Sequence, residues 1–373
     1  MALREDPRPA EARAKPIADV AEILGIEGLR RLGRELTGPC PECGGRDRFS
    51  INSQKGVFNC RKCLATGDVI ELVRWLRKIT LPEALTWLCG EAQEIDDAER
   101  ARREKRAQQN RARAEQQENR YRTKAITQAR RIWREGQPAE DTPVRDYLAL
   151  RGIGRDLLPD LPRVLRYHPD LPYMLDAGAG WIEVHRGPAM LAVVQQAGGQ
   201  GIGVHRTWID LARPRGKALI EHQGEAQKVK KTWGMVKGGA IRLHTPRGSW
   251  DTLVLAEGIE TALTALISGV YPGAAVWAGV SLGNMSGRMR QGKGLRYAGL
   301  PDLADAEAFT PPPWVRQLIL IEDGDSEPRM TRARMMACAR RAMARVPGLV
   351  GRVVPCPAGR DLNDVLLEGV SDE

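Results

Sequence analysis

Cys40-Pro-Glu-Cys43 and Cys60-Arg-Lys-Cys63 are two Cys-x-x-Cys pairs with sixteen residues between them. Four thiolates at this spacing suit tetrahedral zinc, because each pair forms a knuckle and the intervening hairpin closes the site. The pattern therefore predicts a zinc ribbon with one structural zinc ion bound by all four cysteines. A ribbon of this kind is rarely catalytic and usually presents a surface to a nucleic acid.

The segment between the cysteine pairs is rich in basic and aromatic side chains. Residues 48–52 and 56–59 alternate like strands, and they contain Phe49 and Phe58, two of the three phenylalanines in the chain. Basic groups track phosphates while aromatic rings stack on bases, so Arg48 and Phe58 are candidate contacts to nucleic acid. Alternatively, the phenylalanines fill the small core of the ribbon, and the sequence leaves this choice open.

Length and charge bound the other possibilities. The 373 residues exceed one ordinary domain, so two or three are expected. A net charge of +10 favours a polyanionic partner, although a composition rich in arginine for other reasons would give the same number. The absence of a long apolar run predicts no membrane span and a cytoplasmic protein. A reducing compartment also suits the remaining cysteines, expected to be buried thiols: Cys89, Cys338 and Cys356.

Four segments of the chain differ in composition. Residues 1–92 hold the ribbon and short helices, and residues 93–135 form a charged helical linker. Residues 136–248 are basic, rich in strands and punctuated by glycine and proline, which predicts a small mixed α/β subdomain. Residues 249–373 alternate apolar strands with helices, the pattern of a parallel sheet covered by helices. The predicted fold class is therefore multidomain α/β.

The charged linker carries most of the excess positive charge. From Glu99 to Glu135 there are 13 arginines and lysines against 5 glutamates, a net of +8. This composition favours a long solvated helix or a mobile tether. Contact with nucleic-acid phosphates and a passive connecting role are both compatible with it.

Three acidic clusters follow predicted strands in the last segment: Glu257-Gly258, Asp323-Gly324-Asp325 and Asp361-Leu-Asn-Asp364. α/β sheets place their chemistry just past the carboxyl ends of strands. Carboxylates that converge there in a basic protein suggest Mg²⁺, which prefers oxygen ligands and bridges carboxylates to substrate phosphates. The alternative is that these acids merely cap the helices that follow.

These motifs resemble a known family. The strand followed by Glu257-Gly258 and the strand followed by Asp323-x-Asp325 look like the TOPRIM domain of DnaG-type primases, topoisomerases and certain nucleases. The ribbon, with its following Gly-Asp-Val-Ile and Pro-Glu-Ala helices, is similar to the N-terminal zinc domain of DnaG-type primases. Tyr147-LALRGI and Lys231-TWGMVKGGAIRL resemble the basic subdomain of phage- and plasmid-type primases.

The resemblance implies roles for individual residues. Glu257, Asp323 and Asp325 would be the catalytic acids and would bind Mg²⁺ or Mn²⁺, with Asp361 as a further ligand candidate. The role of Asp364 stays open. A set of basic residues would line a groove for template and nucleoside triphosphates: Arg206, Lys217, Lys228, Lys230, Lys231 and Lys237.

The expected function is that of a DNA primase, a nucleotidyltransferase that makes short RNA primers on single-stranded DNA from ribonucleoside triphosphates in phage- or plasmid-type replication. The stretch from Gly287 to Gly294 nearly spells a phosphate-binding P-loop but lacks its Ser or Thr, so a separate replicative helicase is expected as partner. Two alternatives remain: a TOPRIM nuclease that uses the same acids, and a non-catalytic zinc protein that binds DNA during replication.

Overall fold

The computed structural model describes residues 6–32, 35–91, 97–177, 180–292, 294–322, 327–357, 359–360 and 362–371. The chain forms two compact units. The first comprises residues 1–120 and 174–182, and the second comprises residues 121–173 and 183–373.

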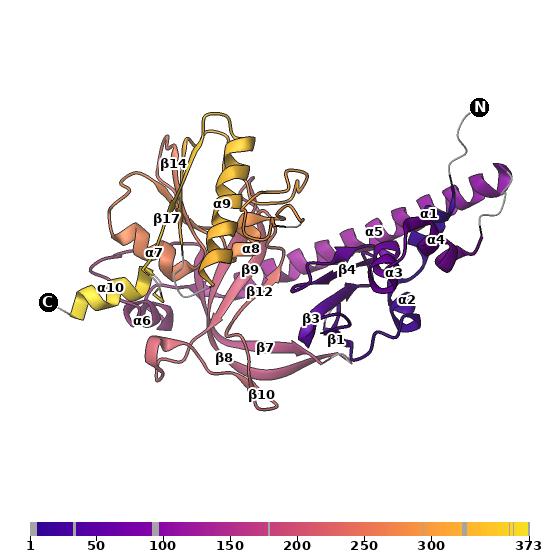
Figure 1. Ribbon diagram of the computed structural model, residues 1–373. Coiled ribbons are helices and arrows are strands. Elements are labelled where there is room, and N and C mark those ends of the chain that lie inside the picture. Colours follow the sequence, from indigo (N-terminus) through magenta and orange to yellow (C-terminus); the bar gives the residue numbers. More distant parts are fainter. Residues whose placement is uncertain are drawn as a thin grey trace. The chain divides into compact units, whose positions relative to one another are not determined.

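The first unit is built on an antiparallel sheet of five strands that runs in sequence order. Its core gathers Phe49, Ile51 and Phe58 from the sheet against Leu72 and Val73 of a following helix. The elements are α1 (Arg8–Ala14), α2 (Ile17–Ile23), β1 (Arg30–Leu32), β2 (Glu35–Cys40), β3 (Gly44–Asn52), β4 (Val57–Cys60), β5 (Thr66–Gly67), α3 (Val69–Arg77) and α4 (Leu81–Cys89) (Figure 1).

Both helices after the ribbon begin at side-chain caps. The carboxylate of Asp68 accepts hydrogen bonds from the backbone N–H groups of Ile70 (3.0 Å) and Glu71 (3.1 Å), which satisfies two donors left free at a helix start. Thr80 and Glu83 form a reciprocal capping box at the start of α4. Asp68 is therefore the N-terminal cap of α3.

The charged linker is one long helix, α5 (Asp97–Glu135), of 39 residues. Its described side chains up to Lys124 are exposed, whereas Ala129 is buried and the indole of Trp133 donates to the carbonyl of Val164 (3.2 Å). The helical interpretation of this segment is confirmed.

None of the helices among the described residues is both long and apolar enough to cross a lipid bilayer.

The second unit contains an antiparallel sheet in the order β12-β9-β8-β7-β6. α6 (Pro143–Ala149) lies between β6 and β7 in sequence, and a short hairpin of β10 and β11 precedes β12. The strands are β6 (Gln137–Pro138), β7 (Leu165–Asp176), β8 (Trp181–Gln195), β9 (Gly201–Trp208), β10 (Glu221–His222), β11 (Glu225–Ala226) and β12 (Lys230–Gly234).

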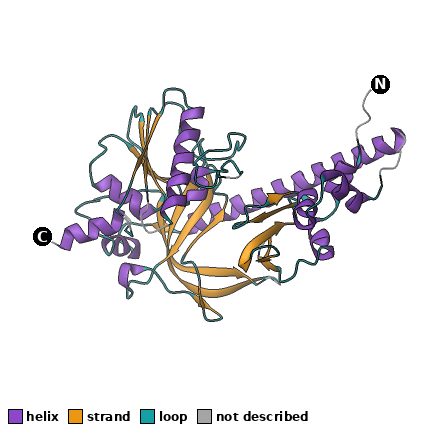
Figure 2. Ribbon diagram, in the orientation of Figure 1, coloured by secondary structure: helices purple, strands orange, loops and turns teal. Residues whose placement is uncertain are grey.

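A second sheet of the same unit has the order β13-β15-β14-β16-β17, and its last four strands are parallel. Helices lie on either side of this sheet (Figure 2). The predicted parallel sheet and the multidomain α/β class are confirmed. The elements are β13 (Ile241–His244), β14 (Thr252–Ala256), α7 (Ile259–Ile267), β15 (Ala275–Ala278), α8 (Leu282–Ser286), β16 (Gln317–Ile321), α9 (Pro328–Arg345), β17 (Val350–Val354) and α10 (Leu362–Ser371).

Helices cover both faces of the parallel sheet because its strands are apolar on both sides. Val254 packs with α7 and with residues of the antiparallel sheet in one hydrophobic cluster. Leu253 and Leu255, which point the opposite way, pack with α9 in another cluster. The two sheets of the second unit therefore share a core, and α7 begins where they meet.

Candidate functional site

The four cysteines of the ribbon converge. Their sulfur atoms all lie within 4.8 Å of one another, with 3.8 Å between Cys40 and Cys63 and 3.7 Å between Cys43 and Cys60. A tetrahedral zinc ion with bonds of about 2.3 Å places its sulfurs about 3.8 Å apart. The N–H groups of Cys43 and Cys63 point at the sulfurs of Cys40 and Cys60, at 3.4 and 3.3 Å. The donor set therefore fits one structural zinc ion, as predicted.

The position of Phe58 contradicts its predicted contact with nucleic acid. It is 1% exposed and stacks on Trp75 with ring centroids 5.4 Å apart, while Phe49 is completely buried beside it. These rings form the core of the ribbon, so the predicted stacking of Phe58 on a base is wrong. Arg48 is half-buried and donates to the carbonyl of Cys43 (3.4 Å), which braces the first knuckle. Its contact with nucleic acid stays a prediction.

A cavity of about 170 Å³ opens in the second unit at the end of β14. Glu257 follows that strand directly, is half-buried and lines the cavity together with two predicted cations, Lys217 and Lys230. The other polar residues that line the cavity were not among the site residues predicted from the sequence. These further residues are Arg151, His205, Glu260 and Thr261.

A buried ion pair forms one wall of this cavity. The ammonium of Lys230 donates to Glu260 Oε2 (2.8 Å), and the hydroxyl of the fully buried Tyr147 donates to Oε1 of the same carboxylate. Burial would raise the pKa of Glu260, but the charges of Lys230 and Lys217 outweigh it and leave that pKa well below its usual value. Glu260 is therefore an anion at neutral pH.

The cavity favours an anionic ligand. Three lining cations, Arg151, Lys217 and Lys230, face two lining carboxylates, while His205 is neutral because burial, aided by the charge of Lys230, lowers its pKa to about 4. Gly258 starts α7 without a side-chain cap, so the positive end of the helix dipole points at the same place. Cations and backbone N–H groups at a helix start together suit phosphate oxygens.

Two residues at the start of α10, Asn363 and Asp364, contact the segments that carry the lining cations Arg151 and Lys217. The amide of Asn363, which is completely buried, donates to the carbonyl of Arg151, and Asp364 forms an ion pair with Arg215 (2.7 Å). Arg151 in turn donates to the carbonyl of Arg215 (3.1 Å), two residues before Lys217. Arg215 has φ +61°, a strained conformation for a non-glycine residue that these contacts maintain. Asp364 therefore has a structural role. We call this set of contacts among Asn363, Arg151, Arg215 and Asp364 the staple.

We expect an Asn363→Leu variant to lose about 1–3 kcal/mol of unfolding free energy, because the buried carbonyl of Arg151 would lose its donor. Denaturant titration of the full chain measures this. An Asn119→Leu change on the exposed face of α5 is the matched control and should be near neutral. Equal midpoints for Asn363→Leu and the wild type would contradict the staple.

Arg206 also corrects a prediction. It is 5% exposed and lies between the rings of Trp208 and Trp233, 5.1 and 5.7 Å from their centroids. Burial lowers its pKa to about 10. Arg206 is therefore a packing residue, not a groove residue. Its cross-strand partner Lys231 lies over Tyr173 (4.2 Å), on the sheet face away from Lys230.

The other two predicted cations lie elsewhere in the second unit. Lys237 is exposed and pairs with Glu307 (2.7 Å) and with the buried Asp305 (3.7 Å). Lys228 is exposed. Neither lines the cavity at β14. Their proposed contacts with template or nucleotide therefore stay predictions.

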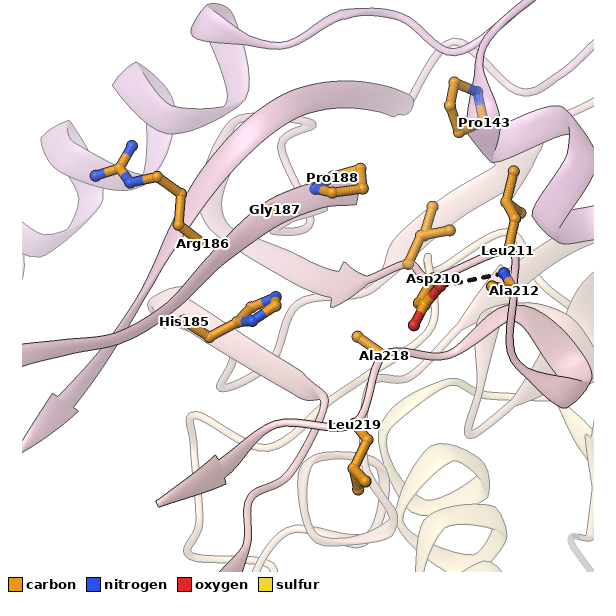
Figure 3. A pocket seen from close by; sticks show the side chains of 11 residues that line it. Pro143, His185, Arg186, Gly187, Pro188, Asp210, Leu211, Ala212, Ala218 and Leu219 are labelled. Carbon is orange, nitrogen blue, oxygen red and sulfur yellow. Dashed lines mark hydrogen bonds between the residues drawn. The ribbon is translucent and has the colours of Figure 1, made fainter. Parts of the chain in front are cut away.

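Another cavity of the second unit, about 430 Å³, has a different character (Figure 3). Its walls are mostly proline, leucine, isoleucine and alanine. Asp210 accepts from the N–H of Ala212 (3.1 Å), and Arg186 is paired with Glu183 (2.7 Å) and Asp170 (3.1 Å). Asp210 and Arg186 thus each have a partner already, and the partners of Arg186 lie outside the cavity lining, so the cavity at β14 is the candidate site.

Three of the predicted acids, Asp323, Asp325 and Asp361, lie outside the described residues. The strand that precedes the first two, β16, is the parallel neighbour of β14, with Leu255 opposite Leu320. Parallel strands end at the same edge of a sheet. Glu257 therefore lies at the sheet edge at which β16 also ends.

The comparison with protein families supports the assignment of the N-terminal segment as a zinc ribbon. Residues 35–70 match a family model described as the zinc-binding domain of primase-helicase, which confirms the predicted resemblance of this segment. Residues 123–243, which include the antiparallel sheet, match a domain of unknown function (DUF7146). No curated protein matches the chain.

Several solved structures are similar to this chain at low identity. The zinc-binding and RNA polymerase domains of Aquifex aeolicus primase share 15% identity over 98% of this chain and 83% of that one, with a TM-score of 0.38. The primase fragment of the bacteriophage T7 primase-helicase shares 16% over 90% and 96%, with a TM-score of 0.34. A DnaG primase catalytic domain bound to single-stranded DNA shares 13% over 66% and 78%, with a TM-score of 0.39.

Proposed function

We propose that this chain is a DNA primase, which synthesises short RNA primers on a single-stranded DNA template. The observation that carries the proposal is the cavity in which Glu257, at the carboxyl end of a parallel strand, meets Arg151, Lys217 and Lys230. The ribbon that matches the zinc-binding domain of primase-helicase supports it. The four segments predicted from the sequence would be the zinc domain, linker, basic subdomain and catalytic domain.

In this proposal the cations bind the triphosphate of the incoming nucleotide. Glu257, with Asp323, Asp325 and Asp361, would hold Mg²⁺ or Mn²⁺, which when bound lowers the cost of the charge that develops on the reacting oxygens. The 3′-hydroxyl of the primer gives its proton to water and attacks the α-phosphorus. The bond from that phosphorus to the oxygen bridging to the β-phosphate breaks, and pyrophosphate leaves. Arg151, Lys217 and Lys230 balance the charge of the leaving group.

The ribbon would contact the template, with Arg48 and its basic neighbours near the phosphates. A replicative helicase would supply the single strand. The ribbon thiols need a reducing compartment such as the cytoplasm to stay available for zinc. Lys228, Lys231 and Lys237 would add contacts to template or nucleotide outside the cavity.

The test is a reaction of the full chain with single-stranded DNA, Mg²⁺ or Mn²⁺, and labelled ribonucleotides. We expect short labelled products that require template and divalent metal. Nicked DNA without such products would replace the primase by a nuclease. Binding to DNA with neither activity would leave a non-catalytic DNA-binding protein.

A further inference from the structure

Glu260 is a buried carboxylate that the proposed chemistry does not use. Its side chain is 7% exposed, and it belongs to the first turn of α7, three residues after Glu257. Both of its oxygens are engaged within the second unit. One accepts from Tyr147 of α6, and the other accepts from Lys230 of β12 at 2.8 Å.

The burial of the Glu260 carboxylate calls for a physical explanation, because burying a charge is costly unless it is paired and hydrogen-bonded. Burial raises the pKa of Tyr147 well above its usual value, and the nearby Glu260 adds to this, so the phenol stays a donor. Glu260 is thus ionised, fully satisfied and locked between two elements. An apolar side chain would fill the same space without that cost, which indicates that the charge is retained for its effect on Lys230.

Lys230 is the group that Glu260 can orient. It begins β12, where it pairs with Thr207 of β9, and its side chain is 31% exposed. Its ammonium has three N–H donors, and Glu260 accepts one of them. A lysine side chain otherwise samples many rotamers, so one fixed anion selects the few that reach the cavity.

The same carboxylate links the two sheets of the second unit. Lys230 comes from the antiparallel sheet, whereas Glu257 and Glu260 come from the strand-to-helix junction of the parallel sheet. All three line the cavity. The contact of Glu260 with Lys230 therefore sets where the cation lies relative to Glu257.

We propose that Glu260 is a positioning residue that holds the Lys230 ammonium beside Glu257, so that the triphosphate of the nucleotide meets this cation and the metal ligand together. The inference rests on the proposed primase function. Glu260 acts through Lys230, because both of its oxygens are already engaged by Tyr147 and Lys230.

The test is a double-variant cycle on the full chain, with KM for ribonucleotides and kcat measured separately. Glu260→Gln keeps the shape but removes the charge, and we expect kcat/KM to fall about 10- to 100-fold, mainly through KM, as for loss of one hydrogen bond between charged groups. In the Lys230→Met variant, kcat/KM should fall by a similar factor. If Glu260 acts through Lys230, adding Glu260→Gln to Lys230→Met should change kcat/KM by less than about threefold.

Glu140→Gln is the matched control, because Glu140 also pairs with a buried arginine, Arg145 (2.6 Å), but does not line the cavity. It should lower stability and leave KM for nucleotide unchanged. Equilibrium binding of Mg²⁺–ATP and Mg²⁺–GTP separates the two failures. A wild-type chain that neither binds these nucleotides nor makes primers defeats the proposed function. An active wild type with additive effects in the cycle, or with the same KM in Glu260→Gln, overturns the role of Glu260 alone.

Discussion

A Glu257→Gln variant should lose primer synthesis by about a thousandfold or more, because a metal that stabilises the reacting oxygens contributes several kcal/mol and each ~1.4 kcal/mol is tenfold in rate. Glutamine has nearly the same shape but a neutral amide that binds Mg²⁺ poorly. The side chain is half-buried at the end of β14 and is not part of the apolar core, so the fold should persist. Primer yield per enzyme under single-turnover conditions measures the loss.

Asp251→Asn is the control for this experiment. Asp251 precedes β14, so it lies at the opposite end of the same strand, and it is exposed. It should keep its primer synthesis and its thermal stability. If Glu257→Gln retains more than about a tenth of wild-type activity, Glu257 is not a metal ligand and the acids must be reassigned. The Glu257 variant should also lose any DNA nicking, because both reactions would use the same site.

Local patterns predicted the elements that depend on local chemistry. Two Cys-x-x-Cys pairs suffice for the ribbon because sulfur geometry is restrictive, and the four sulfurs indeed converge. The glutamate after β14 could be placed at a sheet edge because strand–helix alternation implies a parallel sheet.

Contacts between distant residues could not be predicted in this way. Tyr147 and Glu260 are 113 residues apart, and Asn363 and Arg151 are 212 apart. No periodicity links such positions, because the contacts arise only when the two sheets share a core. The sequence therefore predicted the carboxylate that lines the cavity, Glu257, but not the residues that hold the lining cations in place.

The predicted set of basic groove residues was too large, and the alternation of side chains along a strand would have reduced it. Consecutive side chains of a strand point to opposite faces. Lys230 and Lys231 therefore could not both enter one groove, and only Lys230 reaches the cavity. Arg206 and His205 divide in the same way on β9, where His205 lines the cavity and Arg206 packs between tryptophans. Counting basic residues without this alternation overestimates a binding surface.

Loss of zinc should unfold the ribbon. Structural zinc contributes about 10–16 kcal/mol of apparent binding free energy, which is more than a domain this small gains from packing. Cys60 is completely buried and Cys40 nearly so, and both belong to the hydrophobic cluster that contains Phe49 and Phe58. A Cys60→Ser variant should therefore lose its zinc and expose Trp75, with a red shift of tryptophan emission. A strong chelator should do the same to the wild type.

Cys89→Ser is the matched control, because Cys89 is a half-buried thiol of the same unit that lies outside the cluster of four sulfurs. It should keep about one zinc per chain. The second unit has its own core, so Cys60→Ser should still bind Mg²⁺–ATP while primer synthesis on a DNA template falls steeply. Zinc that stays near one per chain in Cys60→Ser would show that the four cysteines do not form the metal site. Unchanged primer synthesis by a zinc-free variant would instead remove the ribbon from template recognition, because the catalytic unit would then use the template by itself.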